Sequence, residues 1–169
     1  MLKQENNYAF IDSNNLNFGI KSMGWNLDFK KFRIYLREKY SVSVCYLFIG
    51  FIQENQDLYT SLQKDGYVLK FKPVLPQKDG VHKGNVDADL VLQAAVDCCK
   101  NNFNKAIIVT SDGDFYSLVK YLYDEKKLEA VLSPYLETCS TLLKKTAKEK
   151  LRFMDNLRSI LEYKKKNTV

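Results

Sequence analysis

The chain has 169 residues, of which 46% are hydrophobic and 27% are charged, so it is long and apolar enough to bury the core of one ordinary domain. This composition excludes a disordered chain, and no apolar run approaches the roughly 20 residues that a membrane-spanning helix needs. The N-terminal residues lack the basic and apolar regions of a signal peptide, so we expect a cytoplasmic protein with no membrane partner.

The net charge of +6 is unevenly distributed along the chain. Residues 141–169 contain nine basic and three acidic residues, so this segment carries the whole net charge. A basic segment of this kind suits a polyanionic partner such as nucleic acid. The alternative interpretation is a tail that only improves solubility.

The four cysteines show neither CxxC spacing nor a neighbouring histidine, and His82 is the only histidine in the chain. This pattern predicts reduced, mostly buried thiols and argues against a structural zinc site. The cysteines are Cys45, Cys98, Cys99 and Cys139.

The first half of the chain alternates short apolar runs with amphipathic stretches. Residues 8–11 predict a first strand, and apolar residues at helical spacing predict a helix over residues 27–40. The β-branched and aromatic run of residues 42–51 predicts a buried strand. A second helix is predicted over residues 53–64, and the alternating residues 67–72 predict a third strand.

The second half repeats the alternation after a loop. Prolines and a Lys-Asp-Gly turn signal predict that this loop covers residues 73–84. The elements predicted after it are helices over residues 86–100, 115–124, 137–150 and 156–164, and strands over residues 105–110 and 128–133.

Alternating strands and helices, with strands buried on both faces, predict a three-layer α/β/α fold around a mostly parallel sheet of about five strands. No internal repeat, low-complexity segment or linker interrupts the pattern. We therefore predict a single domain over residues 1–163, followed by a basic tail at residues 164–169.

Acidic residues stand where three predicted segments reach one edge of this sheet. Asp12 follows the first strand, and Asp112 and Asp114 follow the fourth. Asp87 and Asp89 begin the helix that leads into the fourth strand. Ligands of open parallel sheets bind outside the carboxyl ends of the strands, where the strand order reverses. If the first and fourth strands are neighbours, these carboxylates converge.

Carboxylates that lie close together repel one another, so a stable cluster indicates a cation that offsets their charge. Ligation by oxygen atoms alone favours Mg²⁺ or Mn²⁺. Each acid taken singly is also typical of helix N-caps and turns, and this simpler interpretation stays open. The chain contains no GxGxxG, GxxxxGK[ST] or GxSxG motif, which disfavours dinucleotide binding, Walker-type nucleotide binding and serine hydrolysis.

Three segments resemble the motifs of one known family, and they occur along the chain in the same order as in that family. They are YAFIDSNNL (residues 8–16), KGNVDADLVLQA (residues 83–94) and IIVTSDGDFYSLVKYL (residues 107–122). Together they resemble the NYN domain, in the LabA-like branch of the PIN-like nuclease superfamily. The resemblance implies a Rossmann-like sheet with strand order 3-2-1-4-5 and metal-dependent cleavage of RNA.

The resemblance also implies roles for individual residues. Asn15 matches a polar residue that supports the first metal-binding acid. Ser111 replaces a glycine of the family pattern, which leaves the acids in place and affects only the tightness of the loop. Asp89 has no clear counterpart, so we predict that it supports the ligands without binding the ion. The acids that match the family's metal ligands are Asp12, Asp87, Asp112 and Asp114.

We therefore predict a Mg²⁺- or Mn²⁺-dependent endoribonuclease in which these acids hold the ion and the ion activates a water molecule. RNA, single-stranded or structured, is the predicted partner, and a homodimer is a further hypothesis. Two other classes stay open: an RNA-binding regulatory module with little activity, and a phosphoesterase that acts on small molecules. The residues predicted to contact substrate are Ser13, Asn15, Lys83, Thr110 and Ser111.

Overall fold

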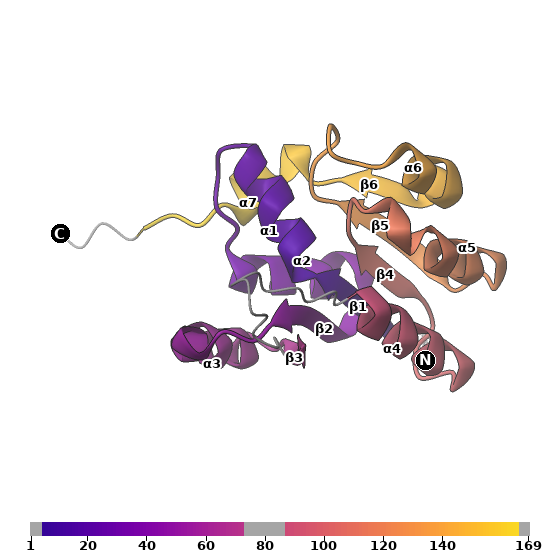
Figure 1. The fold of residues 1–169 in the computed structure, drawn as a ribbon, viewed down its shortest axis with the longest axis horizontal. Helices are drawn as coiled ribbons and strands as arrows, with labels where there is room; N and C mark the ends of the chain where they lie inside the picture. The colour runs from indigo at the N-terminus through magenta and orange to yellow at the C-terminus, as the bar shows by residue number, and fades with distance from the viewer. Residues whose placement is uncertain (1–4, 73–86, 166–169) are drawn as a thin grey trace, which may run out of the picture.

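A parallel β-sheet divides the molecule into two helical layers in the computed structural model, which describes residues 5–72 and 87–165 (Figure 1). In this described part the sheet has six strands in the order β3-β2-β1-β4-β5-β6, and every neighbouring pair is parallel. The strands are β1 (Asn7–Asp12), β2 (Val42–Gly50), β3 (Val68–Lys72), β4 (Ala106–Val109), β5 (Leu128–Ser133) and β6 (Leu151–Phe153).

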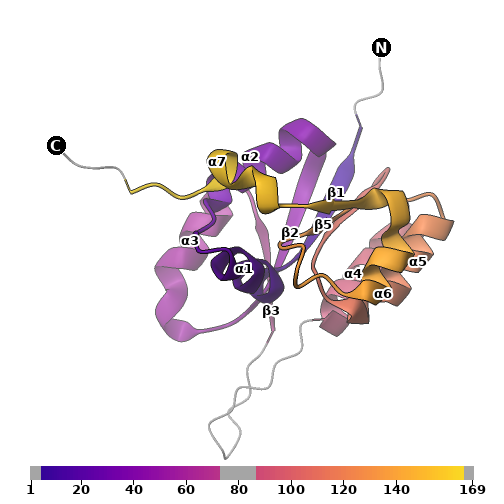
Figure 2. The ribbon, with the colours of Figure 1, turned by 90° about the horizontal axis from the view of Figure 1, so that it is seen from above.

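Helices cover both faces of the sheet, as the view from above shows (Figure 2). One face packs against α1 (Ser13–Ser22), α2 (Phe29–Tyr40), α3 (Gln56–Lys64) and α7 (Arg158–Leu161). The opposite face packs against α4 (Asp87–Cys99), α5 (Tyr116–Asp124) and α6 (Thr141–Ala147).

Successive residues of the central strands point into different layers, as strand geometry requires. Ile11 and Val109 belong to the core on the α1 and α2 side, whereas Phe10 and Ile108 belong to the core on the α4 and α5 side. All four side chains are fully buried. The predicted three-layer fold and the strand order 3-2-1-4-5 are confirmed, with a sixth strand added beyond β5.

The structure differs from the predicted helices near the C-terminus. The helix predicted over residues 137–150 is shorter, because the side chain of Ser140 caps α6 at its start and Lys148, with φ at 50°, ends it. The helix predicted over residues 156–164 is reduced to a 3₁₀ turn and the single-turn α7. Strand β6 was not predicted, because three residues are too few to produce an alternating pattern.

Helix α1 was also absent from the prediction, although it carries part of the candidate site. Asp12 caps it, and Leu16 and Ile20 bury its inner face against the sheet. The loop predicted over residues 73–84, including Lys83, lies outside the described residues.

The predicted state of the cysteines is confirmed: all four are free thiols, three are buried and Cys99 is exposed. Among the helices that the structure describes, none combines the length and apolar character needed to cross a bilayer.

Close packing fixes α1 on the sheet, and this contact is testable. A Cβ atom at Gly19 would lie 2.6 Å from Cβ of Pro134, directly after β5. Overpacking of this kind costs about 1–3 kcal/mol, which exceeds the gain of about 1 kcal/mol that alanine brings to a helix interior. We predict that Gly19→Ala lowers the free energy of unfolding in urea.

The matched control for this change is Lys21→Ala, on the exposed part of the same helix. It should leave stability within about 0.5 kcal/mol of the parent. A Gly19→Ala protein at least as stable as the parent would contradict the close approach of α1 to Pro134.

Candidate metal centre

The candidate site lies at the carboxyl ends of β1 and β4, where the strand order reverses. The chain builds the sheet outward from β1 through β2 to β3, then crosses over and continues with β4 on the other side of β1. The register pairs Ile11 with Val109, so Asp12 and Thr110 follow side by side on neighbouring strands. This is the position where ligands of open α/β sheets bind.

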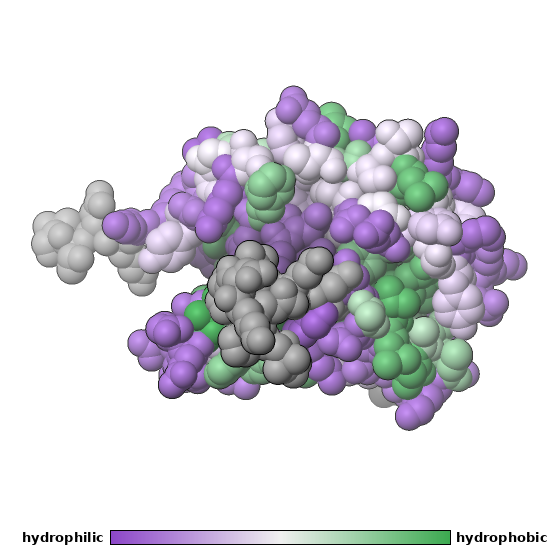
Figure 3. All heavy atoms as spheres, in the orientation of Figure 1, coloured by the Kyte–Doolittle hydropathy of each residue, from purple (hydrophilic) through white to green (hydrophobic). Residues whose placement is uncertain are grey.

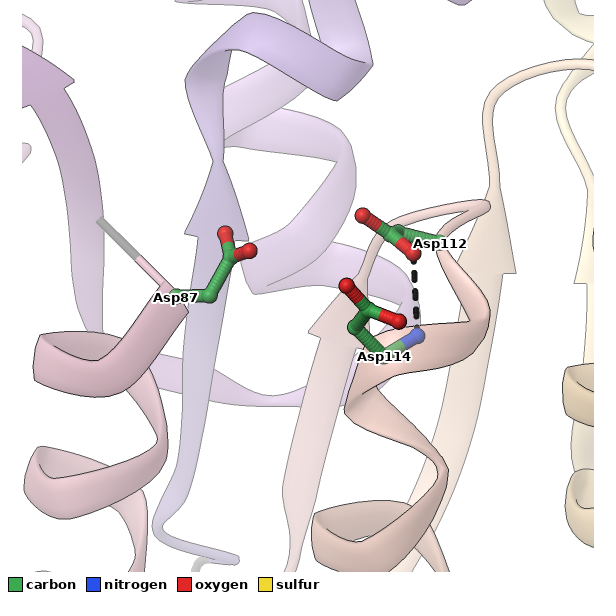
Figure 4. Close-up of side chains that lie close together, drawn as sticks. All are labelled: Asp87, Asp112 and Asp114. Atoms are coloured by element: carbon green, nitrogen blue, oxygen red, sulfur yellow. Dashed lines mark hydrogen bonds between the residues drawn. The ribbon is translucent and has the colours of Figure 1, made fainter. Parts of the chain in front are cut away.

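Three of the predicted acids meet at this edge (Figure 4). Asp87 is the first residue of α4, and Asp112 and Asp114 belong to the turn between β4 and α5. One carboxylate oxygen from each lies within 4.8 Å of the other two. Asp87 faces the two acids of the turn across the end of the sheet (Figure 4).

The turn that carries Asp112 and Asp114 is held by short-range hydrogen bonds. The backbone N–H of Asp114 donates to Oδ1 of Asp112 at 2.9 Å. The backbone N–H of Asp112 donates to Oγ1 of Thr110 at 3.1 Å. Asp112 is therefore the N-cap of a 3₁₀ turn as well as a member of the acidic group.

Asp12 is the most buried of the four acids, with 5% of its surface exposed. The pKa of its carboxyl is raised to about 6. Burial is the largest cause, the charges of Asp87 and Asp112 add to it, and the hydrogen bond from the N–H of Asn15 partly opposes it. The N–H of Asn15 donates to Oδ1 of Asp12 at 3.2 Å, which makes Asp12 the N-cap of α1. Asp12 thus caps a helix and also lies within the electric field of the acidic group.

Asn15 joins helix α1 to the loop after β4 at the site. Its Oδ1 accepts the backbone N–H of Ser111 at 2.6 Å. The hydroxyl of Ser111 in turn is hydrogen-bonded to the hydroxyl of Ser133 at 2.9 Å, which connects the loop to β5. These contacts hold the loop after β4 at a fixed distance from α1.

Several residues predicted to contact substrate are enclosed by the fold. Ser13, Thr110 and Ser111 are buried, and the last two form the loop contacts given above. The structure thus shows these two residues shaping the loop, and their contact with a substrate stays a prediction. Asp89 is exposed and lines a groove between α4 and the β2–β3 edge, outside the acidic group.

The donor set fits a hard divalent cation. Within residues 5–72 and 87–165, this is the one group of His, Cys, Asp or Glu close enough to share an ion, and all of its donors are carboxylates. Mg²⁺ binds such oxygens at about 2.0–2.1 Å, which would bring them to about 3–4 Å from one another. The observed separations require only small side-chain movements to reach this range.

A pocket of about 490 Å³ adjoins the acids on the side of α6. Asp112 and Asp114 form one side of it, and its other lining residues include Asn15, Tyr116, Thr138, Ser140 and Leu142. The last three were not predicted, because residues 137–150 were expected to form one continuous helix. A serine directly before an amphipathic run is an N-cap signal, and it could have shown that α6 begins after Ser140.

The family model described as the NYN domain matches residues 8–154. The chain belongs to the NYN domain family. This confirms the family predicted from the three sequence segments, while the finer assignment to the LabA-like branch stays a prediction. The search against curated proteins gave no match.

This NYN domain also has a solved structural neighbour, a protein of unknown function from Vibrio parahaemolyticus. The comparison covers 95% of this chain and 98% of that one, with a TM-score of 0.77 and 19% sequence identity. At this identity the likeness shows a shared fold. The NYN domain therefore shares its α/β fold with this neighbour, and in this chain an aspartate cluster lies at the switch point.

The raised pKa of Asp12 predicts how metal-free stability depends on pH. The carboxyl has an ordinary pKa of 3.8 when unfolded and about 6 when folded, so its ionisation costs stability as the pH rises through this window. Asp12→Asn removes that cost and keeps the helix cap. We predict that the variant gains up to about 3 kcal/mol over the parent at pH 7.5 and little at pH 4.

Urea unfolding in EDTA at the two pH values measures this difference. Asp57→Asn, which removes an exposed charge from α3, serves as the control and should show no such pH dependence. The same stability change at both pH values would contradict the assignment of the raised pKa to Asp12.

Proposed function

We propose that this NYN domain is a Mg²⁺- or Mn²⁺-dependent endoribonuclease of the LabA-like type. The observation that carries the proposal is the grouping of Asp87, Asp112 and Asp114, with Asp12 beside them, at the switch point of a nuclease-type fold. Three separate chain segments contribute these carboxylates, and a cluster of this kind is costly unless it holds a cation.

In this proposal Asp87, Asp112 and Asp114 hold the ion, and Asp12 completes its surroundings from the end of β1. A bound divalent ion supplies the means to ionise a water molecule and to offset charge on a phosphoryl oxygen. The protein's own contribution is positional. The hydrogen bond between Asn15 and Ser111 keeps the two acid-bearing loops in register, so that water and phosphate are presented in a fixed geometry.

Positive charge near the site favours a polymer of phosphates over a small phosphoester. Helix α6, which adjoins the pocket, carries Lys144 and Lys145. Lys164 and Lys165 continue the basic segment beyond α7 and are exposed. Contacts of this type bind the backbone of nucleic acid without sequence choice and weaken as salt rises.

The direct test is cleavage of a 5′-labelled single-stranded RNA by the purified protein with Mn²⁺, with Mg²⁺ and with EDTA. We predict cleavage that requires the metal and that falls by at least about 10- to 100-fold in Asp112→Asn. Asp57→Asn should cut at the parental rate, since it lies on α3, away from the acidic group.

Other outcomes would assign the protein to one of the alternative classes. RNA binding without cleavage under any condition would favour a binding module. Turnover of a generic phosphoester without cleavage of RNA would favour a small-molecule phosphoesterase. Equal cleavage by Asp112→Asn and the parent would remove the acidic group from the active site.

The metal can be tested without reference to activity. A ligand at 100 times its Kd stabilises the folded state by about 2.7 kcal/mol, which raises the Tm of a protein of this size by about 5–10 °C. We predict such a rise with Mn²⁺, and we predict that Asp87→Asn and Asp112→Asn each lose most of it. An undiminished rise in both variants, measured beside Asp57→Asn, would exclude a shared site.

A further inference from the structure

The pocket beside the acids has a neutral, partly apolar wall that metal binding does not explain. Tyr116 is 42% exposed and Leu142 is 46% exposed, although both are large apolar side chains. They line the pocket together with the hydroxyl-bearing residues Thr138 and Ser140. Apolar surface shows over α6 among hydrophilic side chains (Figure 3).

This wall is attached rigidly to the acid-bearing turn. The backbone N–H of Ser140 donates to the carbonyl of Ser111 at 3.0 Å. A Cβ atom at Gly113 would lie 2.4 Å from Oγ and 3.1 Å from Cβ of Ser140, so the turn and the start of α6 are in direct contact. Whatever binds against Tyr116 and Leu142 is therefore held at a fixed position relative to Asp112.

The charges around the pocket indicate what kind of ligand it can bind. Among the described residues, those that line it include no Lys or Arg, and its charged members are the acids Asp112 and Asp114. A phosphate seated against Tyr116 would meet no positive partner there. Lys145 stands one helical turn after Leu142 and is exposed, so positive charge is available outside the pocket, along the same face of α6.

An unpaired nucleobase has the required properties: flat apolar faces, polar edges and no charge. Recognition of single-stranded RNA uses aromatic side chains that stack on a base and polar groups that reach its edge. The pocket offers Tyr116 for stacking, and it offers the hydroxyls of Thr138 and Ser140 and the amide of Asn15 for the edge. A base inside a duplex is stacked on both faces and could not enter.

We propose that this pocket binds one unpaired nucleobase next to the scissile phosphate, with Tyr116 as its stacking platform. The proposal rests on the endoribonuclease function given above and makes single-stranded RNA its substrate class. In this arrangement the adjoining phosphate lies at the acids, and the next phosphates pass Lys145 on α6.

The test compares two fluorescent eight-residue chains in EDTA at low salt, where no metal-dependent cleavage occurs. One is oligouridylate, and the other has the same ribose-phosphate backbone without bases. We predict that the parent protein binds the oligouridylate about 5- to 150-fold more tightly, the range that one base stacked on an aromatic side chain provides. Tyr116→Ala should lose this preference, and Tyr116→Phe should keep it.

Tyr121→Ala is the matched control, since Tyr121 is 37% exposed on the same helix and lies outside the pocket lining. It should bind both chains as the parent does. The proposal is overturned if the parent binds the two chains equally, or if Tyr116→Ala keeps the preference. If the preference depends on Tyr116 and no RNA is cut under any metal condition, the base-binding role of the pocket is supported and the nuclease function is refuted.

Discussion

The pairing of β1 with β4 is the constraint on which the site depends. These two strands come from distant parts of the sequence, and their register sets Ile11 beside Val109 in the centre of the sheet. The residues that follow β1 and those that follow β4 consequently lie at the same edge of the sheet. Burial at this edge raises the pKa of Asp12, and the charges of Asp87 at the start of α4 and of Asp112 after β4 raise it further.

Two of the acids serve the local fold as well as the site. Asp12 caps α1, and Asp112 caps the turn before α5, each by accepting a backbone N–H. These contacts fix each carboxylate in place and stabilise its charge in part, so the cluster is preorganised in the metal-free protein. The sequence leaves open whether these residues cap helices or bind metal. One carboxylate has enough oxygen lone pairs to do both, so the two roles are compatible.

The sequence predicts the features that depend on local pattern. Apolar runs place five strands, and the position of Asp12, Asp87, Asp112 and Asp114 relative to those strands predicts their convergence. Helix α1 escapes prediction because its Ser, Asn and Gly residues are poor helix formers, and tertiary burial of Leu16 and Ile20 outweighs that propensity.

The pocket could not be predicted for a different reason. Its wall forms where the start of α6 meets the turn at Gly113, and that contact joins residues far apart in the chain. Local pattern carries no information about such a contact, although the N-cap signal of Ser140 marks the correct start of the helix. The hydrogen bond between Asn15 and Ser111 is equally long-range, and it gives both residues a structural role at the site.

A crystal structure of the protein with saturating Mn²⁺ decides whether Asp87, Asp112 and Asp114 hold one divalent ion. We predict a single anomalous-scattering peak about 2.1 Å from oxygens of Asp87, Asp112 and Asp114, with Asp12 beside it. A peak elsewhere on the molecule, or no peak between these carboxylates, would rule out this metal site.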